Sequence, residues 1–302
     1  MYIITGATGN TGKRIVENLL KAGKPVTAVG RSAEKLQPLA DQGAKTAVGD
    51  LSDASFLTAT FRGATAVYAM IPPNAAAPDF RAYQNEIGLA IIEAVKNSGV
   101  KSVVTLSSFG AHSPQTGVVA GLYDFETDFK KAAAANVLHL RAGFFMQNFF
   151  GNIGLIKGMG INGGFPINGD VKMPMLHTDD IADAATEHLL NLDFSGQTHL
   201  YLANADLTMV EATQILGNAV GKPDLQWITF PYDQAKGGMM QMGFSESLAD
   251  AYIQFGRATN EGIMYTGYER EPEYKTPTSL ATFAEREFAA AFQQAETTPA
   301  QS

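Results

Sequence analysis

The sequence predicts an α/β fold: a doubly wound parallel sheet with a smaller, interleaved α+β lobe towards the C-terminus. Two observations support this prediction. Short apolar segments alternate with amphipathic ones through the first half of the chain, as in strands joined by right-handed helical crossovers. After about Gly143 this alternation gives way to a stretch rich in aromatic residues and glycine, which indicates a different kind of packing.

Six strands are expected in the first half. The first runs directly into a glycine-rich turn, and the helix after it carries Ile15, Leu19 and Leu20 on one stripe before Gly23 and Pro25 end it. The later strands are short apolar runs bounded by polar or turn residues. The expected strands are 2–5, 26–29, 45–48, 66–70, 102–106 and 137–140, and the expected helices are 11–22, 80–97 and 123–135.

The second half is expected to contribute the smaller lobe and the end of the sheet. Asn168-Gly169 is a signal for a two-residue β-hairpin. Further along, we expect a helix from Asp179, a strand at 199–204, and helices at 209–220 and 233–256. The predicted units are a sheet domain at 1–150 completed by parts of 176–205, a substrate-side lobe at 151–175 and 206–294, and a flexible tail at 295–302.

Composition excludes several classes of function. The chain of 302 residues has no cysteine, so disulfides and thiolate chemistry are absent. A net charge of -8 argues against direct nucleic-acid binding. The first apolar run meets the glycine turn within a few residues, and no apolar run approaches the ~20 residues of a membrane span. We therefore expect a cytoplasmic protein without a signal peptide.

The glycine-rich turn, TGATGNTGKR at 5–14, predicts a phosphate-binding site. Gly6, Gly9 and Gly12 stand at the junction of a strand and a helix. A helix amino terminus offers unpaired N–H groups, and glycines let a pyrophosphate approach the backbone. The alternative is a tight turn that needs a positive φ, which one glycine would satisfy. The pattern favours an NAD(P)-binding Rossmann-type domain.

The residues after the second strand indicate which dinucleotide is bound. An acid at this place would bind the ribose hydroxyls of NAD(H), but the sequence here is VGRSAEK at 29–35. Arg31 can bind a 2′-phosphate through its fork of donors, and Lys35 follows one helical turn later. NADP(H) is therefore favoured over NAD(H). The alternative is that both cations are solvated surface charges.

Several motifs together resemble one family. TGATGNTG, the GRS after the second strand, GDLSD at 49–53, LRAGFFMQN at 140–148 and LHTDDIADAA at 176–185 are similar to the NmrA-like group of atypical short-chain dehydrogenases/reductases. The resemblance covers about residues 1–230. It implies either an NAD(P)H-dependent reductase of quinones or dyes, or a cofactor-binding sensor that performs no chemistry and binds a protein partner.

The resemblance also implies which residues contact the cofactor. The pyrophosphate would be surrounded by Gly6, Thr8, Gly9, Asn10, Thr11 and Gly12. The 2′-phosphate would face Arg31, Ser32 and Lys35, and the adenine would lie between Asp50 and Leu51. Asp50 could also cap the helix that follows, and the two roles are compatible. The nicotinamide ribose would pass the strand ends at Met70, Ile71, Pro72, Ser107 and Ser108.

The catalytic group is unknown from the sequence. The superfamily's usual proton donor is a Tyr with a Lys four residues later, and the candidate Tyr123 is followed at that distance by Thr127. Hydride transfer to a flat acceptor needs placement and exclusion of water more than an acid. Phe144, Phe145 and Asn148 are the candidates for the wall of the acceptor cleft.

No metal site is expected. His177, Asp179 and Asp180 are close in sequence, but adjacent residues rarely share one metal, and an aspartate cap of the following helix is the simpler interpretation. The leading hypothesis is an NAD(P)H-dependent reductase of a small apolar acceptor such as a quinone or a dye. The alternative is the non-catalytic sensor, and an epimerase or dehydratase is disfavoured because Thr127 replaces the Lys.

Overall fold

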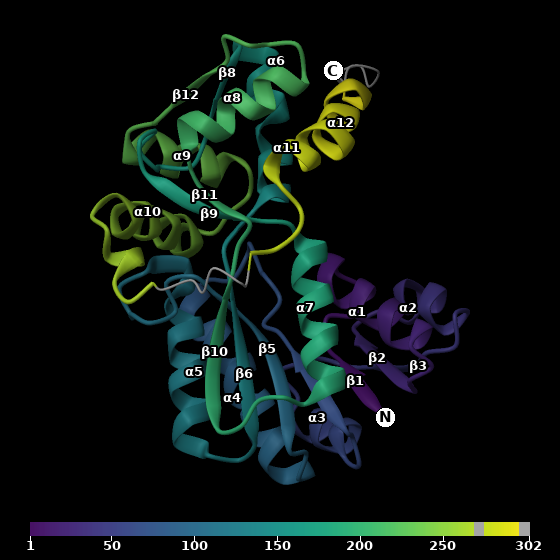
Figure 1. The fold of residues 1–302 in the computed structure, drawn as a ribbon. Helices are drawn as coiled ribbons and strands as arrows, with labels where there is room; N and C mark the ends of the chain where they lie inside the picture. The colour runs from purple at the N-terminus through teal and green to yellow at the C-terminus, as the bar shows by residue number, and fades with distance from the viewer. Residues whose placement is uncertain (269–274, 296–302) are drawn as a thin grey trace.

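The computed structural model describes residues 1–268 and 275–295, and its centre is a seven-stranded sheet (Figure 1). The strand order is β10-β6-β5-β4-β1-β2-β3, and all six pairings are parallel. The fold class predicted from the sequence is therefore confirmed. The strands are β1 (Tyr2–Ile4), β2 (Val26–Gly30), β3 (Lys45–Val48), β4 (Ala66–Ala69), β5 (Ser102–Ser108), β6 (Asn136–Ala142) and β10 (Gln197–Leu202).

Helices cover both faces of this sheet and bury one apolar core on each. On one face α7 packs against α1 and the central strands, and α2 adds Leu36 and Leu39 to the same core. On the other face α4 packs between α3 and α5. The first group is α1 (Asn10–Lys21), α2 (Ala33–Ala40) and α7 (Thr178–Asn191), and the second is α3 (Ala54–Phe61), α4 (Phe80–Ser98) and α5 (Ala120–Ala132).

The remaining elements form a second lobe at the carboxyl ends of the strands (Figure 1). Its two small sheets are β11-β9-β7 and β12-β8. The strands are β7 (Phe144–Phe145), β8 (Ile161–Gly163), β9 (Lys172–Leu176), β11 (Ala205–Thr208) and β12 (Gln226–Ile228). The longer helices are α6 (Ile153–Met159), α8 (Met209–Ala219), α9 (Tyr232–Gln241), α10 (Glu246–Asn260) and α12 (Ala289–Gln294). The short helical segments are η1 (Gly117–Val119), η2 (Met146–Asn152), η3 (Ile263–Tyr265), α11 (Leu280–Phe283) and η5 (Ala284–Phe288).

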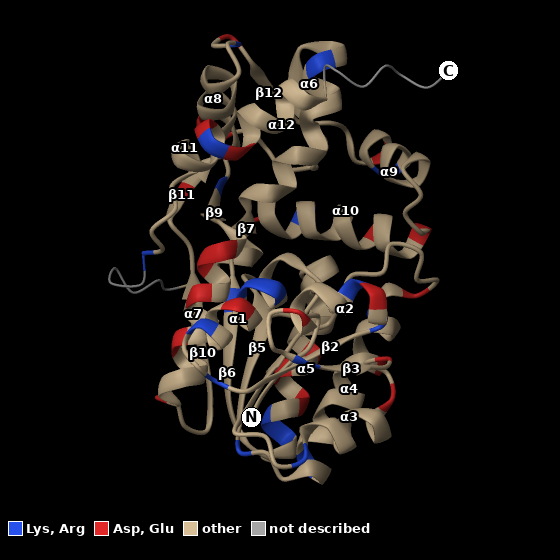
Figure 2. Ribbon diagram, turned by 90° about the vertical axis from the view of Figure 1, so that its right-hand side faces the viewer, with Lys and Arg blue, Asp and Glu red and all other residues tan. Residues whose placement is uncertain are grey.

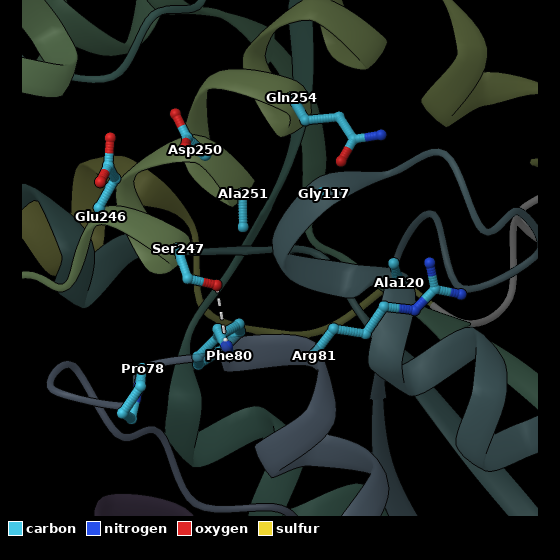
Figure 3. Close-up of a pocket in the computed structure, with 10 residues that line it drawn as sticks. All are labelled: Pro78, Phe80, Arg81, Gly117, Ala120, Glu246, Ser247, Asp250, Ala251 and Gln254. Carbon is cyan, nitrogen blue, oxygen red and sulfur yellow. Dashed lines mark hydrogen bonds between the residues drawn. The ribbon is translucent and has the colours of Figure 1, made fainter.

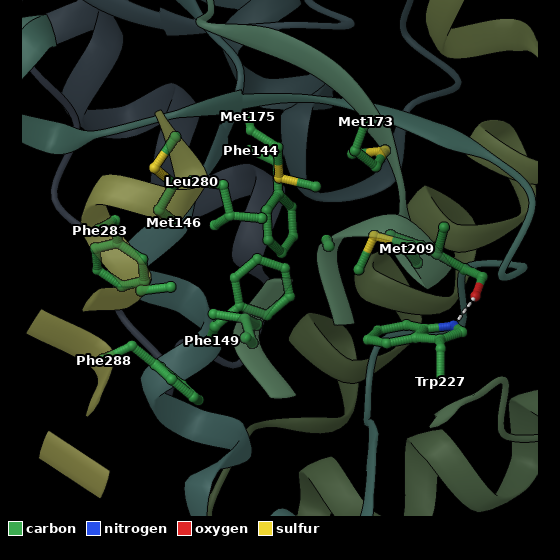
Figure 4. Close-up of a cluster of buried hydrophobic side chains, with 14 of the residues drawn as sticks. Phe144, Met146, Phe149, Met173, Met175, Met209, Trp227, Leu280, Phe283 and Phe288 are labelled. Atoms are coloured by element: carbon green, nitrogen blue, oxygen red, sulfur yellow. Dashed lines mark hydrogen bonds between the residues drawn. The ribbon is translucent and has the colours of Figure 1, made fainter. Parts of the chain in front are cut away.

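Phenylalanine and methionine side chains fill the core of this lobe (Figure 4). Phe144 contacts Phe149 and Phe165 with ring centroids 5.4 and 5.3 Å apart. The indole N–H of Trp227 needs a hydrogen-bond acceptor in this apolar core, and it donates to the Ile167 carbonyl at 2.9 Å. The aromatic run after β6 therefore serves largely to hold the lobe together.

Two expectations for this lobe are wrong. Asn168 does begin a turn, with its carbonyl accepting from the Val171 N–H at 3.2 Å, but the flanking segments do not form a hairpin. β8 pairs with β12, and β9 pairs with β11 and β7. The single helix expected at 233–256 is two helices, because the chain turns at 242–245 and the Ser245 side chain caps α10. Both errors concern elements outside the parallel sheet.

Two predictions concern the limits of the structural units. Of the tail predicted at 295–302, residues 296–302 lie outside the described residues. The division into a sheet domain and a substrate-side lobe remains our proposal. Within residues 1–268 and 275–295, no helix is both long and apolar enough to cross a bilayer. Figure 2 shows basic and acidic residues interspersed on the helices around the sheet in that view.

Candidate cofactor-binding site

The three glycines of the first turn differ in backbone conformation and in what surrounds them. Gly6 has φ +61° and lies against Met70, whose sulfur would be 2.7 Å from an added Cβ. A Cβ at Gly12 would be 2.3 Å from the Gly6 carbonyl oxygen, so the close packing of α1 on the loop requires glycine there. Gly9 has φ -86° and its nearest neighbour would be 3.4 Å away. Neither a positive φ nor packing requires glycine at this position, which is also the cap position of α1, where glycine is favoured, so the approach of a ligand to Gly9 stays a prediction.

The amino end of α1 is open to an anion. Gly9 is the residue at the cap position, no side chain caps the helix, and no acidic residue lies in its first turn. Thr8, Gly9 and Asn10 are exposed. Two hydrogen bonds hold the loop in place on the neighbouring strands. The Thr5 hydroxyl accepts from the Met70 N–H at 3.1 Å, and the Ala7 N–H donates to the Val29 carbonyl at 3.1 Å. Unpaired N–H groups and the helix dipole favour a phosphate there.

A cavity of about 210 Å³ extends from this loop across the carboxyl ends of β2, β3 and β4. We call it the glycine cavity. It brings together many of the residues predicted to hold the cofactor: Gly6, Thr8, Gly9, Arg31, Asp50, Leu51, Met70 and Pro72. Its other lining residues are Val29, Gly30, Gly49, Pro73, Tyr83 and Ile87.

Two opposite charges stand at the far end of the glycine cavity. Arg31 is exposed and makes no hydrogen bond or ion pair with any other described residue. Asp50 accepts from the backbone N–H and the hydroxyl of Ser52, both at 2.9 Å. These bonds, with a smaller contribution from the Arg31 charge, lower the pKa of Asp50. Asp50 therefore stays ionised at neutral pH and can accept hydrogen bonds.

Asp50 does not cap the helix that follows it. Asp53 does so, accepting from the backbone N–H groups of Ser55 and Phe56 at 2.9 Å. The alternative role considered for Asp50 is thus taken by its neighbour. Asp50 instead holds the turn before the helix through its two bonds from Ser52, and its contact with a cofactor stays a prediction.

Tyr83 lines the cavity although no sequence signal pointed to it. Its hydroxyl donates to the Pro72 carbonyl at 3.0 Å and so fixes the loop after β4 over the cavity. Gly49 was also missed as a lining residue. A Cβ there would be 2.5 Å from the Phe56 ring, which explains the glycine of the GDLSD motif by packing.

Other predicted cofactor residues do not line the cavity. Ser32 caps α2, its oxygen accepting from the Lys35 N–H at 3.3 Å, and the Lys35 side chain is exposed. The Ser107 hydroxyl donates to Glu126 at 2.5 Å, and that of Ser108 to the Phe109 carbonyl at 3.1 Å. The rest of this group is Asn10, Thr11, Gly12 and Ile71.

Tyr123, the weak catalytic candidate, lies on the wall of a different cavity. We call this the histidine cavity; its volume is about 310 Å³ and it shares no lining residue with the glycine cavity. It is lined by Ala111, His112, Tyr123, Glu126, Thr127, Lys130, His139, Arg141, Gln197, Thr198 and His199.

Of the residues predicted for the acceptor cleft, Phe144 is buried, Phe145 is half-buried and Asn148 is exposed. These roles stay predictions.

The interlobe groove is larger, at about 510 Å³ (Figure 3). It lies between the amino ends of α4 and α5 and the helix α10, where the Phe80 N–H donates to the Ser247 hydroxyl at 3.0 Å. Its charges are already compensated, because Arg81 pairs with Asp124 and Lys236 pairs with Glu246 and Asp250. We assign it no ligand.

The aspartates after β9 do not cap α7, contrary to expectation. His177 does so, its Nδ1 accepting from the Asp179 N–H at 3.1 Å, while its Nε2–H donates to Glu287 at 2.8 Å. Asp179 pairs with Arg14, and Asp180 accepts from the backbone and hydroxyl of Thr278. In the described part of the chain, no cluster of three or more His, Asp or Glu residues could hold a metal.

Comparison with known proteins agrees with this architecture. The profile of the NmrA-like family matches residues 2–284. A curated relative, the NAD(P)H azoreductase of Xenophilus azovorans, is 31% identical over 253 residues, which span 83% of this chain and 84% of the relative.

Two solved structures share the fold. The NADPH-dependent quinone oxidoreductase of Escherichia coli, solved with NADPH, superposes with a TM-score of 0.81 at 22% identity and covers 95% of this chain and 100% of its own. The triphenylmethane reductase of Citrobacter sp., solved with NADP(H), has a TM-score of 0.74 at 21% identity and covers 98% and 100%. At these identities the likeness establishes the fold alone.

Proposed function

This chain belongs to the NmrA-like family, and from that premise we propose that it is an NAD(P)H-dependent oxidoreductase. The observation that carries the proposal is Gly9, whose bare backbone is required by neither conformation nor packing and which faces the glycine cavity beside an uncapped helix. The azoreductase relative, which matches along most of both chains, is named for the same class of cofactor.

We further propose that NADP(H) is preferred over NAD(H). Arg31 is an exposed guanidinium without a described partner at the end of the cavity where the adenosine would lie. Ser32 and Lys35 follow on α2 and add a hydroxyl and a second cation nearby. A fork of donors suits the 2′-phosphate better than the bare ribose.

The acceptor we propose is a small, flat, apolar molecule such as a quinone or a dye. The bound cofactor would supply the hydride. The chain would bind it through the α1 amino end and Arg31, fix the adenine through Asp50 and Leu51, and orient the ring past Met70 and Pro72. Phe144, Phe145 and Asn148 remain our candidates for the acceptor side, where apolar walls would exclude water.

Such a reductase needs no dedicated acid, because water can protonate the oxygens of a reduced quinone. This agrees with the position of Tyr123 on the histidine cavity rather than the glycine cavity. It also removes the need for the Lys that Thr127 replaces.

The test is oxidation of NADPH and NADH against a panel of quinones, azo dyes and triphenylmethane dyes. We expect turnover with at least one acceptor and a higher kcat/KM for NADPH. Tight binding of NADPH without turnover on any acceptor would refute the reductase and leave the sensor, for which a protein partner would then be sought.

A further inference from the structure

The pair Asn168-Gly169 lies in a turn of the second lobe, between β8 and β9. An asparagine followed by glycine is prone to spontaneous deamidation, because glycine has no side chain that hinders attack of its nitrogen on the asparagine amide. The same pair occurs a second time in the chain, as Asn162-Gly163 in β8. The two copies lie in very different surroundings.

The reacting groups of Asn168-Gly169 are free. Asn168 is exposed, and its side-chain amide makes no hydrogen bond with any described residue. The Gly169 N–H, which would attack this amide, is likewise unbonded within residues 1–268 and 275–295. Only other main-chain groups hold the turn: the Asn168 N–H donates to Oδ1 of Asn260 at 2.8 Å, and the Gly169 carbonyl accepts from the Val210 N–H at 3.0 Å.

Asn162 has the same two groups in bonded form. Its side chain is fully buried, and Nδ2 donates to the Thr213 hydroxyl at 3.0 Å. Its Oδ1 accepts from Nδ2 of Asn152 at 2.8 Å and from the Gly163 N–H at 3.0 Å. The nitrogen that would attack is therefore bonded to the oxygen of the amide, and these bonds must break before Asn162 can react.

We propose that Asn168 is a site of spontaneous deamidation and that the fold protects Asn162. The Gly169 nitrogen gives its proton to hydroxide and bonds to the side-chain carbonyl carbon of Asn168. The bond from that carbon to the amide nitrogen breaks, and this nitrogen takes up a proton and leaves as ammonia. Water then opens the resulting succinimide ring at either of its carbonyls, which gives aspartate or isoaspartate.

Isoaspartate changes the turn more than aspartate does. In isoaspartate the Cβ of residue 168 becomes part of the main chain, which lengthens by one methylene. This methylene falls between the two anchored groups, the N–H that donates to Asn260 and the Gly169 carbonyl that accepts from Val210. The two hydrogen bonds cannot both keep their geometry, so the turn must move.

A tryptophan beside the turn can report this movement. Gly169 packs against Trp227, whose Cδ1 would lie 3.3 Å from an added Cβ. The Trp227 indole also donates to the carbonyl of Ile167, the residue directly before Asn168 (Figure 4). Because Trp227 is the only tryptophan in the chain, its fluorescence should change as isoaspartate accumulates.

The test incubates the folded chain at mildly alkaline pH and follows both asparagines by mass spectrometry. Trypsin cleaves after Lys157 and Lys172, so residues 158–172 form one peptide that contains both pairs. Asn168 should convert roughly a hundredfold faster than Asn162, because three hydrogen bonds, each worth about a factor of five, protect Asn162. The rate should rise with pH, because the attacking nitrogen must lose its proton.

The control is the same chain unfolded in guanidinium chloride, where both asparagines should convert at similar rates because glycine follows each. Asn168→Gln keeps an amide but requires a larger ring, so its tryptophan fluorescence should stay constant. The proposal is overturned if Asn168 keeps its amide in the folded chain while the unfolded chain deamidates, or if Asn162 converts equally fast in the folded chain. Neither result bears on the proposed reductase, which is measured by NADPH oxidation with freshly prepared protein.

Discussion

The glycine cavity and the histidine cavity are built in opposite ways. The first is made by backbone, with a loop and a helix end that need small residues at fixed spacing. The second is made by side chains from α5, β6, β10 and the loop after β5, which meet only in the folded molecule. A backbone site is visible in the sequence as a motif, whereas a side-chain site appears only as scattered residues. The difference also predicts how each responds to mutation and pH.

The largest effect is expected at Gly9 of the glycine cavity. Gly9→Val leaves room for the side chain in the free protein, so the fold should survive, but it blocks the approach of a pyrophosphate. Loss of two charge-assisted contacts of ~1.5–3 kcal/mol each corresponds to roughly a thousandfold weaker NADPH binding. Fluorescence titration measures this.

Gly12→Val is the comparison for that variant, because its Cβ would meet the Gly6 carbonyl. It should lower the melting temperature, whereas Gly9→Val should not. Native NADPH affinity in folded Gly9→Val would show that the loop is only a turn.

A second prediction concerns His139 and pH. Its pKa is about 4 in the folded state and ~6.5 in the unfolded chain, so the unfolded state binds the proton more readily between these values. Stability from this group is complete above pH 6.5 and is lost as pH falls towards 4, where the loss should reach on the order of 3 kcal/mol. Urea unfolding at several pH values measures it.

His139→Gln should remove that part of the acid sensitivity while leaving the contributions of carboxylates in place. The comparison is therefore between the two slopes of unfolding free energy against pH. Identical slopes in the variant and the original chain would mean that His139 is not held neutral.

The third prediction separates the two dinucleotides. Arg31→Asp replaces attraction by repulsion at a 2′-phosphate, so NADPH should weaken roughly ten- to a hundredfold more than NADH. Arg62→Asp, at the carboxyl end of α3 and outside the cavity, is the matched control and should affect neither. An equal loss for both cofactors would remove Arg31 from the 2′-phosphate site.

The smallest effect is expected for Tyr123→Phe. Because Tyr123 lies on the histidine cavity, kcat for quinone reduction should change by no more than a few-fold. A general acid is typically worth ~10²–10⁴-fold, so steady-state kinetics distinguishes the two cases clearly. If Tyr123→Phe lowered kcat a hundredfold with native NADPH affinity, Tyr123 would be a proton donor. The histidine cavity would then take part in the same reaction as the glycine cavity.

The parts that the sequence predicted are those set by local rules. The sheet strands and the residues at their carboxyl ends, such as Arg31 and Asp50, follow from periodicity and from where parallel sheets bind ligands. Tyr83 lies in a helix that was expected, but its bond to Pro72 depends on a loop geometry that no spacing encodes.

Long-range strand pairing explains why the predicted hairpin is wrong. The segment after Asn168 carries a hairpin signal, yet it forms a ladder with Ala205–Thr208, which lies some thirty residues later. The histidine cavity could not be predicted from the sequence either, because His112, His139 and Gln197 are far apart in the chain. They meet only where α5 and the loop after β5 pack against β6 and β10.

The late arrival of β10 has a consequence for synthesis on the ribosome. Tyr201 bonds to Arg141, 60 residues earlier, so the outer edge of β6 has no partner strand until this segment has emerged. At ~5–20 residues per second that interval is roughly 3–12 s, long enough for an open strand edge to recruit a chaperone or pair wrongly. All residues of the glycine cavity precede Gly88, so a nascent chain could already hold its nucleotide while the histidine cavity does not yet exist.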